Sequence, residues 1–270
     1  MPEGPEVKYL TDYVLNKYVG KKLLDIKIKS GRYKNHQPPE HFKSFVKQLP
    51  LKCLDIYKKG KVMFFIFEND WFLISKLGMT GWWYSDDNEP TWRDANTKNV
   101  IFEFNKIDDL YFSDFRNFGT ITISQDQNLI KTELDKLAPD ICNINTKFTD
   151  IKKLIEKNKE SHKYIEDVII DQKIIFSGIG NYLKSEILYQ AKISPTRKLV
   201  SITLDEWLSI FTIGQRICKK MFKTLMEEDI DKYIDTMKVY QKKIDPLGNK
   251  IHKRTTKQGR STFYVPSIQK

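Results

Sequence analysis

The chain has 270 residues, and its 46 Lys and Arg against 35 Asp and Glu give it a formal net charge of +11. This length allows one large or two ordinary domains, and a hydrophobic content of 40% is sufficient for a packed core, which excludes a wholly disordered polycation. The longest uninterrupted apolar run, residues 62–67, is far shorter than the ~20 residues of a membrane-spanning helix, and the charged, Pro-rich start differs from a signal peptide. We therefore expect an intracellular, globular protein that acts away from membranes.

The first 125 residues combine one amphipathic helix with many short strands. Apolar residues recur at helical spacing over residues 6–18, which predicts a helix just inside the amino terminus. Strands are predicted at residues 24–28, 53–58, 62–67, 71–77, 100–104, 110–112 and 120–123. Turn residues such as Lys59-Gly60 separate them, and many short strands at this spacing indicate an antiparallel β-sandwich or a flattened barrel, of which we predict the sandwich over residues 1–125.

After Ser124 the pattern changes from strands to helices. Polar residues predict a linker over 126–145, and helical periodicity then defines a second domain over 146–237. Its helices are predicted at residues 148–158, 164–171, 181–191, 204–226 and 230–237. A Gly-rich turn precedes the third helix, where Asn181 is a suitable N-cap and exposed backbone amides would bind phosphate.

The last segment, 238–270, carries much of the positive charge. It contains nine basic residues and one acid, and apolar and aromatic residues alternate with the charges as in a folded hairpin. A solvated, disordered end is the alternative. The whole chain is therefore predicted to be a two-domain α+β protein that binds a polyanion: a β-sandwich with a helix at its start, then a helical domain that ends in a β-hairpin.

Cysteines and histidines are dispersed along the chain. Cys53, Cys142 and Cys218 lie 89 and 76 residues apart and include no C-x-x-C pair. An odd number of isolated cysteines predicts buried thiols, not a disulfide framework or a cysteine-based zinc site. The sequence therefore predicts no metal and no cofactor.

Several segments, taken in chain order, resemble the motifs of one enzyme family. They are the start Met1-Pro2-Glu3-Gly4-Pro5-Glu6, then 59–61, 77–81, 113–119, 178–186 on to Pro195, and 258–264. Together they resemble the formamidopyrimidine-DNA glycosylase / endonuclease VIII family of base-excision repair enzymes, over nearly the whole chain. The resemblance implies a helix–two-turn–helix within 146–237 and two activities, DNA glycosylase and abasic-site lyase.

The terminal hairpin departs from the family's zinc-binding members. On our alignment, Leu247, Lys250, Val265 and Ile268 stand where those members have cysteines, and none of these side chains ligates zinc. The chain thus resembles the zincless-finger, endonuclease VIII-like branch. Apolar packing of Leu247, Val265 and Ile268 is expected to replace the coordination bonds.

The resemblance makes Pro2 the catalytic nucleophile. Once Met1 is removed, Pro2 is a secondary amine, and α-amino groups titrate near ~7.7–8.0, so a useful fraction is uncharged at neutral pH. Bonding to the sugar as a Schiff base would permit strand cleavage by β,δ-elimination. The alternative is that Pro2 merely follows the initiator methionine.

The resemblance also implies roles for nearby charged residues. Glu3 would protonate the sugar ring oxygen or move the C2′ proton, and Glu6, one helical turn away, is a second candidate acid. Both could instead be negative charges at a helix start. Lys61 would place an ammonium near the phosphate or lesion, or else be a solvated lysine at a strand end.

Contacts with DNA are implied for five further residues. Asn181 and Arg260, from different domains, would bind the phosphates that flank the lesion, with Arg260 completing the catalytic set. Three side chains would fill the space left by an extruded base: Phe118 as a wedge, Arg116 toward the orphaned partner base and Met79 as a plug. Alternatively, Met79 and Phe118 are core residues at strand ends.

We therefore predict an enzyme, a bifunctional DNA glycosylase and abasic-site lyase. It would act as a monomer on double-stranded DNA that contains oxidised bases or abasic sites, with single-stranded DNA as a second partner. The alternatives are a catalytically inert damaged-DNA binding protein and a single-strand nucleic-acid binding module. The presence of Pro2, Glu3 and Lys61 favours the enzyme.

Overall fold

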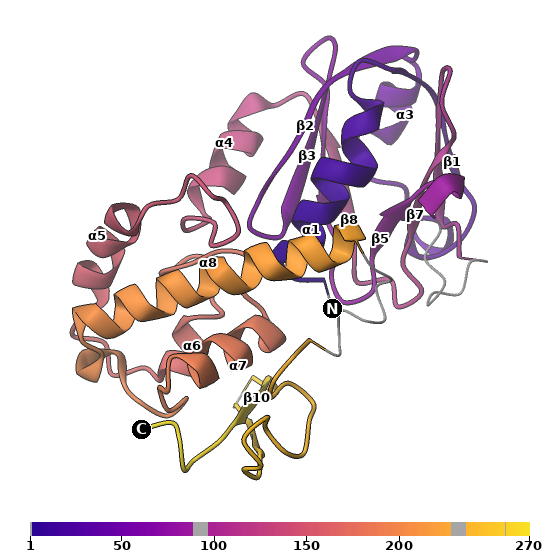
Figure 1. The fold of residues 1–270 in the computed structure, drawn as a ribbon. Coiled ribbons are helices and arrows are strands. Elements are labelled where there is room, and N and C mark those ends of the chain that lie inside the picture. The colour runs from indigo at the N-terminus through magenta and orange to yellow at the C-terminus, as the bar shows by residue number, and fades with distance from the viewer. Residues whose placement is uncertain (1, 89–96, 228–235, 257) are drawn as a thin grey trace. The chain divides into compact units, whose positions relative to one another are not determined.

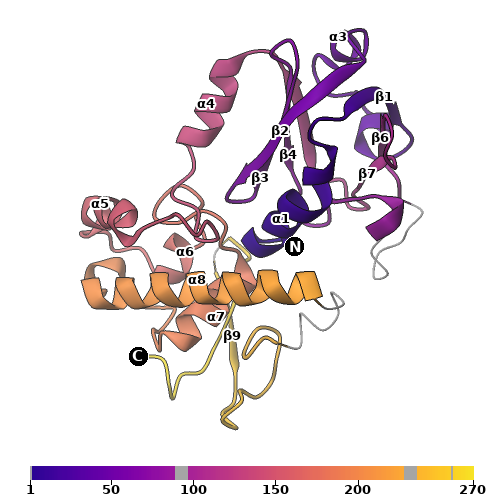
Figure 2. The ribbon, with the colours of Figure 1, turned by 45° about the horizontal axis from the view of Figure 1, so that its top comes forward.

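The computed structural model describes residues 2–88, 97–227, 236–256 and 258–270. The chain forms two compact units: unit 1 consists of Met1–Pro2 and Glu6–Asp135, and unit 2 of Glu3–Pro5 and Lys136–Lys270. Figures 1 and 2 show the ribbon in two views, with helices and strands of each unit labelled where there is room. No helix within the described ranges is long and apolar enough to cross a membrane.

Unit 1 is built on eight antiparallel strands. These are β1 (Lys22–Ile28), β2 (Leu51–Lys59), β3 (Val62–Phe67), β4 (Phe72–Lys76), β5 (Trp82–Tyr84), β6 (Val100–Phe104), β7 (Leu110–Ser113) and β8 (Thr120–Ser124). Their order is β5-β7-β6-β1-β2-β3-β4-β8. Strands β1 and β2 pair only through Lys22↔Lys52 and Leu23↔Leu51, so this short ladder joins two four-stranded groups.

Trp83 lies in the core between these two groups. Its ring centroid is 5.2 Å from that of Phe65 on β3 and 5.0 Å from that of Phe112 on β7, and its indole N–H donates to Ser75 Oγ on β4 at 3.0 Å. The groups therefore face each other across aromatic side chains, as a sandwich requires. The sequence did not predict β5, because three residues are too few to show a period of two.

The N-terminal helix is interrupted. Residues 6–18 were predicted as one helix, whereas the structure has α1 (Gly4–Tyr9), a π-helical turn η1 (Leu10–Leu15) and a 3₁₀ turn η2 (Asn16–Tyr18). The Thr11 hydroxyl donates to the Val7 carbonyl at 2.8 Å, a side-chain bond to the preceding turn that accompanies bends in helices. The remaining helices of unit 1 are α2 (Arg32–Asn35), α3 (Phe42–Val46), η3 (Asp86–Asn88) and α4 (Gln127–Asp135). Helix α4 lies within the segment 126–145 that was predicted as a linker.

Unit 2 is mainly helical. Its elements are α5 (Phe148–Asn158), α6 (Ile165–Val168), α7 (Asn181–Gln190), η4 (Leu199–Ser201), α8 (Leu204–Glu227) and the strands β9 (His252–Thr255) and β10 (Ser261–Tyr264). The predictions at 148–158, 181–191 and 204–226 are correct to within a residue, and the helix predicted at 164–171 is shorter. Most of the helix predicted at 230–237 lies outside the described residues. The predicted two-domain α+β fold is confirmed.

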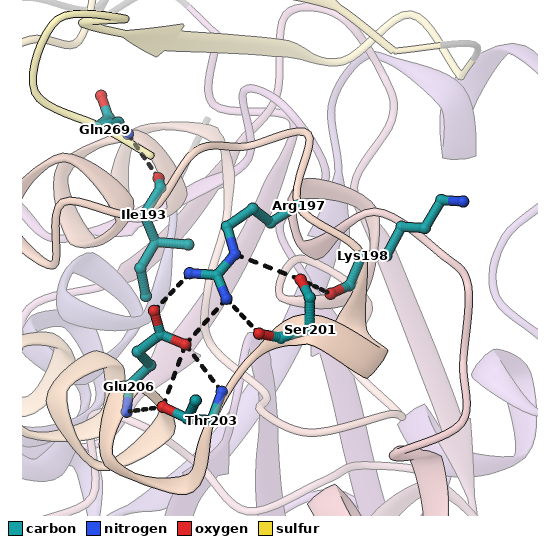
Figure 3. Close-up of polar contacts among 7 residues, drawn as sticks. All are labelled: Ile193, Arg197, Lys198, Ser201, Thr203, Glu206 and Gln269. Atoms are coloured by element: carbon teal, nitrogen blue, oxygen red, sulfur yellow. Dashed lines mark hydrogen bonds and ion pairs between the residues drawn. The ribbon is translucent and has the colours of Figure 1, made fainter.

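A polar network fixes the start of α8, the long orange helix in Figure 1. Glu206 Oε2 accepts from the Thr203 backbone N–H at 2.8 Å, and Thr203 Oγ1 accepts from the Glu206 N–H at 3.3 Å, which is a capping box. Arg197 donates to the same carboxylate (Figure 3). Nearby, the Gln269 side chain donates to the Ile193 carbonyl at 2.9 Å and ties the chain end to the loop after α7.

The terminal hairpin is an antiparallel pair of strands, in register from Ser261↔Thr255 to Tyr264↔His252. Val265 is fully buried, and Ile268 packs against its cluster, as expected from the sequence. The expectation for Leu247 is wrong, because 75% of this residue is exposed.

Polar groups hold the turn around Leu247. The buried Asp245 carboxylate accepts from the backbone N–H groups of Leu247 (2.9 Å) and Asn249 (2.7 Å) and from the Tyr189 hydroxyl (2.9 Å). A carboxylate that accepts backbone N–H groups fixes such a turn locally. In the described ranges, no group of His, Cys, Asp or Glu could hold a metal ion, so the residues of this hairpin do not fit zinc.

Candidate active site

Glu3, near the N-terminus of the chain, caps the start of α7, which is distant in the sequence. Its carboxylate accepts from the backbone N–H groups of Gly180 (2.7 Å), Tyr182 (2.9 Å) and Leu183 (3.1 Å), and only 2% of the residue is exposed. The first N–H groups of a helix have no partner within the helix and carry partial positive charge. Three such donors favour the ionised carboxylate over the neutral acid.

This arrangement corrects two expectations. The N-cap of α7 is Gly180, which has no side chain, and Asn181 is the first helical residue. The backbone amides expected to bind phosphate are in large part occupied by the Glu3 carboxylate. A Cβ on Gly180 would overlap the Glu3 side chain, so glycine is needed here for the close approach. Pro2 directly precedes this buried acid.

A second buried carboxylate, Glu166 on α6, holds the terminal hairpin. It is fully buried, and it accepts from Arg254 Nε on β9 and from the Thr262 hydroxyl on β10, both at 2.6 Å. On α7, Ser185 Oγ accepts from the Phe263 backbone N–H at 3.1 Å. The hairpin is therefore fixed to α6 and α7 by charged and polar bonds as well as by apolar packing.

Replacing Arg254 with Met should destabilise unit 2 by about 3 kcal/mol, because a buried carboxylate that loses its cation keeps its full desolvation cost. Denaturant unfolding at pH 7 measures this. Lys159→Met is the matched control, since the Lys159–Glu156 pair is exposed and solvent screens such pairs, so its loss should change stability little. Equal effects of the two variants would contradict the assigned role of Glu166.

Asn181 and Arg260 both lie in unit 2, whereas they were expected to come from different domains. Arg260 is exposed in the turn between β9 and β10, where its backbone N–H donates to Thr256 Oγ1 at 3.2 Å. Asn181 Oδ1 is buried and has no hydrogen-bond partner among the described residues. Helix α7 packs against β10, and both belong to unit 2.

Lys61 lies in unit 1, in the turn between β2 and β3. Lys59 pairs with Val62, so Gly60 and Lys61 are the two turn residues, and Gly60 has a positive φ of 59°. The neighbouring Lys58 and Lys59 donate to the carbonyls of Gly60 (3.3 Å) and Leu134 (2.8 Å). Glu6 is buried in the first turn of α1, so both interpretations of Glu6 stay open.

Met79, Arg116 and Phe118 lie on two adjacent loops of unit 1. A Cβ on Gly78 would be 2.6 Å from the Phe118 carbonyl carbon, and the Arg116 backbone N–H donates to Thr80 Oγ1 at 3.3 Å. Met79 is 37% exposed and Phe118 53% exposed, which contradicts the alternative that they are core residues. The Arg116 guanidinium lies 5.1 Å from the centroid of the Phe118 ring. The structure thus brings these three side chains to one exposed edge.

Sequence reasoning missed Glu166 and Lys184. Residues 182–189 of α7 are all buried, including Lys184, of which no surface is exposed. The sequence does carry a signal for Lys184, because α7 has apolar residues on all sides, as a buried helix has, and Lys184 is a charged residue among them. Sequence alone could not identify the charges that act on it.

The fold is thus that of a two-domain α+β protein whose N-terminal segment supplies a buried acid to the helical unit. The chain belongs to the formamidopyrimidine-DNA glycosylase family: the model of the family's N-terminal domain matches residues 1–121, and the model of its H2TH domain matches residues 137–232.

Relatives of known name agree over the full chain. A Ureaplasma parvum protein named formamidopyrimidine-DNA glycosylase is 32% identical, with 100% of both chains covered, and one from Mycoplasma genitalium is 27% identical, with 100% of this chain and 96% of the relative covered. The names of these relatives do not test the assignment to the zincless-finger branch, which stays a prediction.

Solved structures of the Lactococcus lactis formamidopyrimidine-DNA glycosylase are similar throughout. Its non-covalent complex with DNA that contains an AP site has a TM-score of 0.80 at 26% identity, with 99% of each chain covered. Its complex with DNA that contains an oxidised pyrimidine has a TM-score of 0.81 at 25% identity, with 100% of each chain covered.

Proposed function

We propose that this protein is a DNA glycosylase and abasic-site lyase that removes oxidised bases from double-stranded DNA. The observation that carries the proposal is the position of Pro2, which would carry the terminal amine once Met1 is removed, directly before a buried carboxylate held by three N–H groups at the start of α7. The relatives support it by name, and two of the similar structures contain DNA with an AP site or an oxidised pyrimidine.

The amine of Pro2 supplies the covalent step. Its nitrogen bonds to C1′ of the damaged nucleoside, and the base leaves with the electron pair of the N-glycosidic bond. Opening of the sugar ring and loss of the amine proton give an iminium. The iminium acidifies the C2′ proton, so elimination releases first the 3′ phosphate and then the 5′ phosphate.

Glu3 acts on the sugar. Because three N–H donors favour its charged form, we infer that Glu3 enters the reaction as an anion. It stabilises the positive charge that develops on C1′ and the ring oxygen as the base leaves. This favours an electrostatic role in base removal over a role as an acid that is protonated in the free enzyme.

The remaining candidates bind and reshape the DNA. Arg260 and Asn181 contact phosphates beside the lesion, and Lys61 places an ammonium near the phosphate or the lesion. Met79, Arg116 and Phe118 fill the space of the extruded base. Their exposure at one edge suits this role, because unstacking a base costs a few kcal/mol that such fillers offset.

Borohydride reduction in the presence of abasic DNA tests the proposal. We expect a covalent protein–DNA adduct that peptide mass spectrometry maps to Pro2, in protein from which Met1 has been removed. Intact duplex without a lesion is the control and should give no adduct.

Two outcomes would overturn the assignment. An adduct on Lys61 or another internal lysine would refute Pro2 as the nucleophile. Binding to lesion DNA without any adduct or strand cleavage would instead indicate an inert damage-binding protein.

A further inference from the structure

Lys184, in the first turns of α7, is a buried lysine for which the reaction just described has no use. No surface of this residue is exposed, and its Nζ has no hydrogen-bond partner in the described part of the chain. Its neighbours on the helix are also buried, so the side chain does not reach water along the helix surface. Burying an ammonium in this way is costly unless nearby charges compensate.

Four charged groups, from three places in the fold, act electrostatically on the Lys184 ammonium. They are Glu3 at the start of the chain, Glu166 and Asp167 on α6, and Arg260 in the hairpin turn. Glu166 already accepts from Arg254 and Thr262. Glu3 lies at the start of the same helix as Lys184, because its carboxylate accepts from the N–H of Leu183, the residue before Lys184, and from that of Gly180. The Glu3 carboxylate therefore contacts the same turn of α7 that contains the backbone of Lys184.

This burial is unfavourable for the folded protein. Burial lowers the pKa of Lys184 to about 8, although Glu166 and Glu3 act in the opposite direction. An apolar side chain of similar length would avoid this cost, and charged groups kept at such a cost are concentrated at functional sites. Lys184 therefore requires an explanation other than stability.

We propose that Lys184 is a positioning residue whose ammonium keeps Glu3 ionised and so sets the lowest pH at which Glu3 assists base removal. The inference rests on the role proposed for Glu3. The coupling is reciprocal: the cation favours the carboxylate, and the carboxylate favours the cation. A preformed abasic site has already lost its base, so cleavage at that site does not depend on the charge of Glu3.

Two substitutions test the proposal, Lys184→Met, which removes the charge at similar length, and Lys184→Arg, which restores it. Single-turnover base removal and cleavage of a preformed abasic site are measured from pH 5 to pH 9. We expect Lys184→Met to move the acidic limb of base removal upward by about one pH unit, which is about tenfold in rate at any pH on that limb. The alkaline plateau and the abasic-site cleavage should stay within about twofold, and Lys184→Arg should restore the limb.

Thermal unfolding separates this role from a structural one. The pKa of Lys184 in the folded protein, about 8, is below the value of 10.5 for an unburied lysine. The folded state therefore binds fewer protons than the unfolded state between these values, and the stability of the wild type should rise with pH from about 8 to 10.5. Lys184→Met should lack this rise and melt at a higher temperature than the wild type at pH 7. Lys219→Met, an exposed lysine on α8, is the matched control.

The outcomes distinguish this inference from the proposed function. An unchanged acidic limb in Lys184→Met, or an equal loss of rate at every pH, would overturn the role of Lys184 while leaving the Pro2 adduct intact. Failure of the wild-type protein to form a borohydride adduct at Pro2 would overturn the proposed function itself.

Discussion

Glu3→Gln should lower the rate of base removal by about 10²–10³-fold, with cleavage of a preformed abasic site lowered much less. The substitution removes the negative charge that stabilises the developing cation on the sugar. It also replaces one acceptor oxygen with an NH₂ group that faces the N–H donors of α7, which costs about 1–3 kcal/mol of stability. Single-turnover assays on oxidised-base and abasic duplexes, each at saturating protein, measure the two rates.

Asp150→Asn is the matched control for Glu3→Gln. Asp150 is also a carboxylate at a helix start: it lies in the first turn of α5, and its Oδ2 accepts from the backbone N–H of Lys147 at 2.7 Å. Its substitution should cost about 1 kcal/mol of stability without changing either rate. Were Glu3→Gln to slow both reactions equally, or Asp150→Asn to slow base removal as much, Glu3 would be a structural cap and not a catalytic anion.

The outcome at the start of α7 indicates what a sequence can predict. Local residue preferences predict a turn at the glycines and a helix after it, and the helix begins at the predicted residue, Asn181. The identity of its cap does not follow, because the cap comes from Glu3, more than 170 positions away. Only the folded chain brings this carboxylate to the helix amides, and intrinsic N-cap preference is a weaker effect than a charged acceptor in place.

In the terminal hairpin too, the sequence predicted the strands but not which side chain fixes the turn before them. Alternating apolar and basic residues correctly predicted two antiparallel strands. The family resemblance implied that Leu247, Val265 and Ile268 would pack where zinc-binding members have cysteines; Val265 is buried, whereas Leu247 is exposed and Asp245 fixes that turn through backbone N–H groups. A polar side chain that bonds within a turn leaves no periodic signal, so composition could not reveal it.

Pro2→Gly should reduce strand cleavage at an abasic site by about 10²-fold or more, which is about 3 kcal/mol in the barrier. The terminal amine is retained, but it becomes a primary amine. The iminium of a secondary amine has no N–H to lose and stays positively charged, whereas the imine of glycine is charged only while it is protonated. A neutral imine withdraws fewer electrons from C2′, so the proton there is less acidic and elimination is slower. Glycine also lacks the ring that limits the orientation of the nitrogen.

Gel assays of strand cleavage, together with the yield of borohydride adduct, measure this effect, and the adduct at the terminus should be lost or strongly reduced. Pro38→Gly, in an exposed segment of unit 1, is the control, because it makes the same change in backbone freedom away from Glu3 and should leave both readouts unchanged. Cleavage by Pro2→Gly at the wild-type rate would mean that the secondary amine is not required. The imine would then form on the primary amine at the terminus of the variant or on another amine of the chain, and the mapped position of the adduct would identify which.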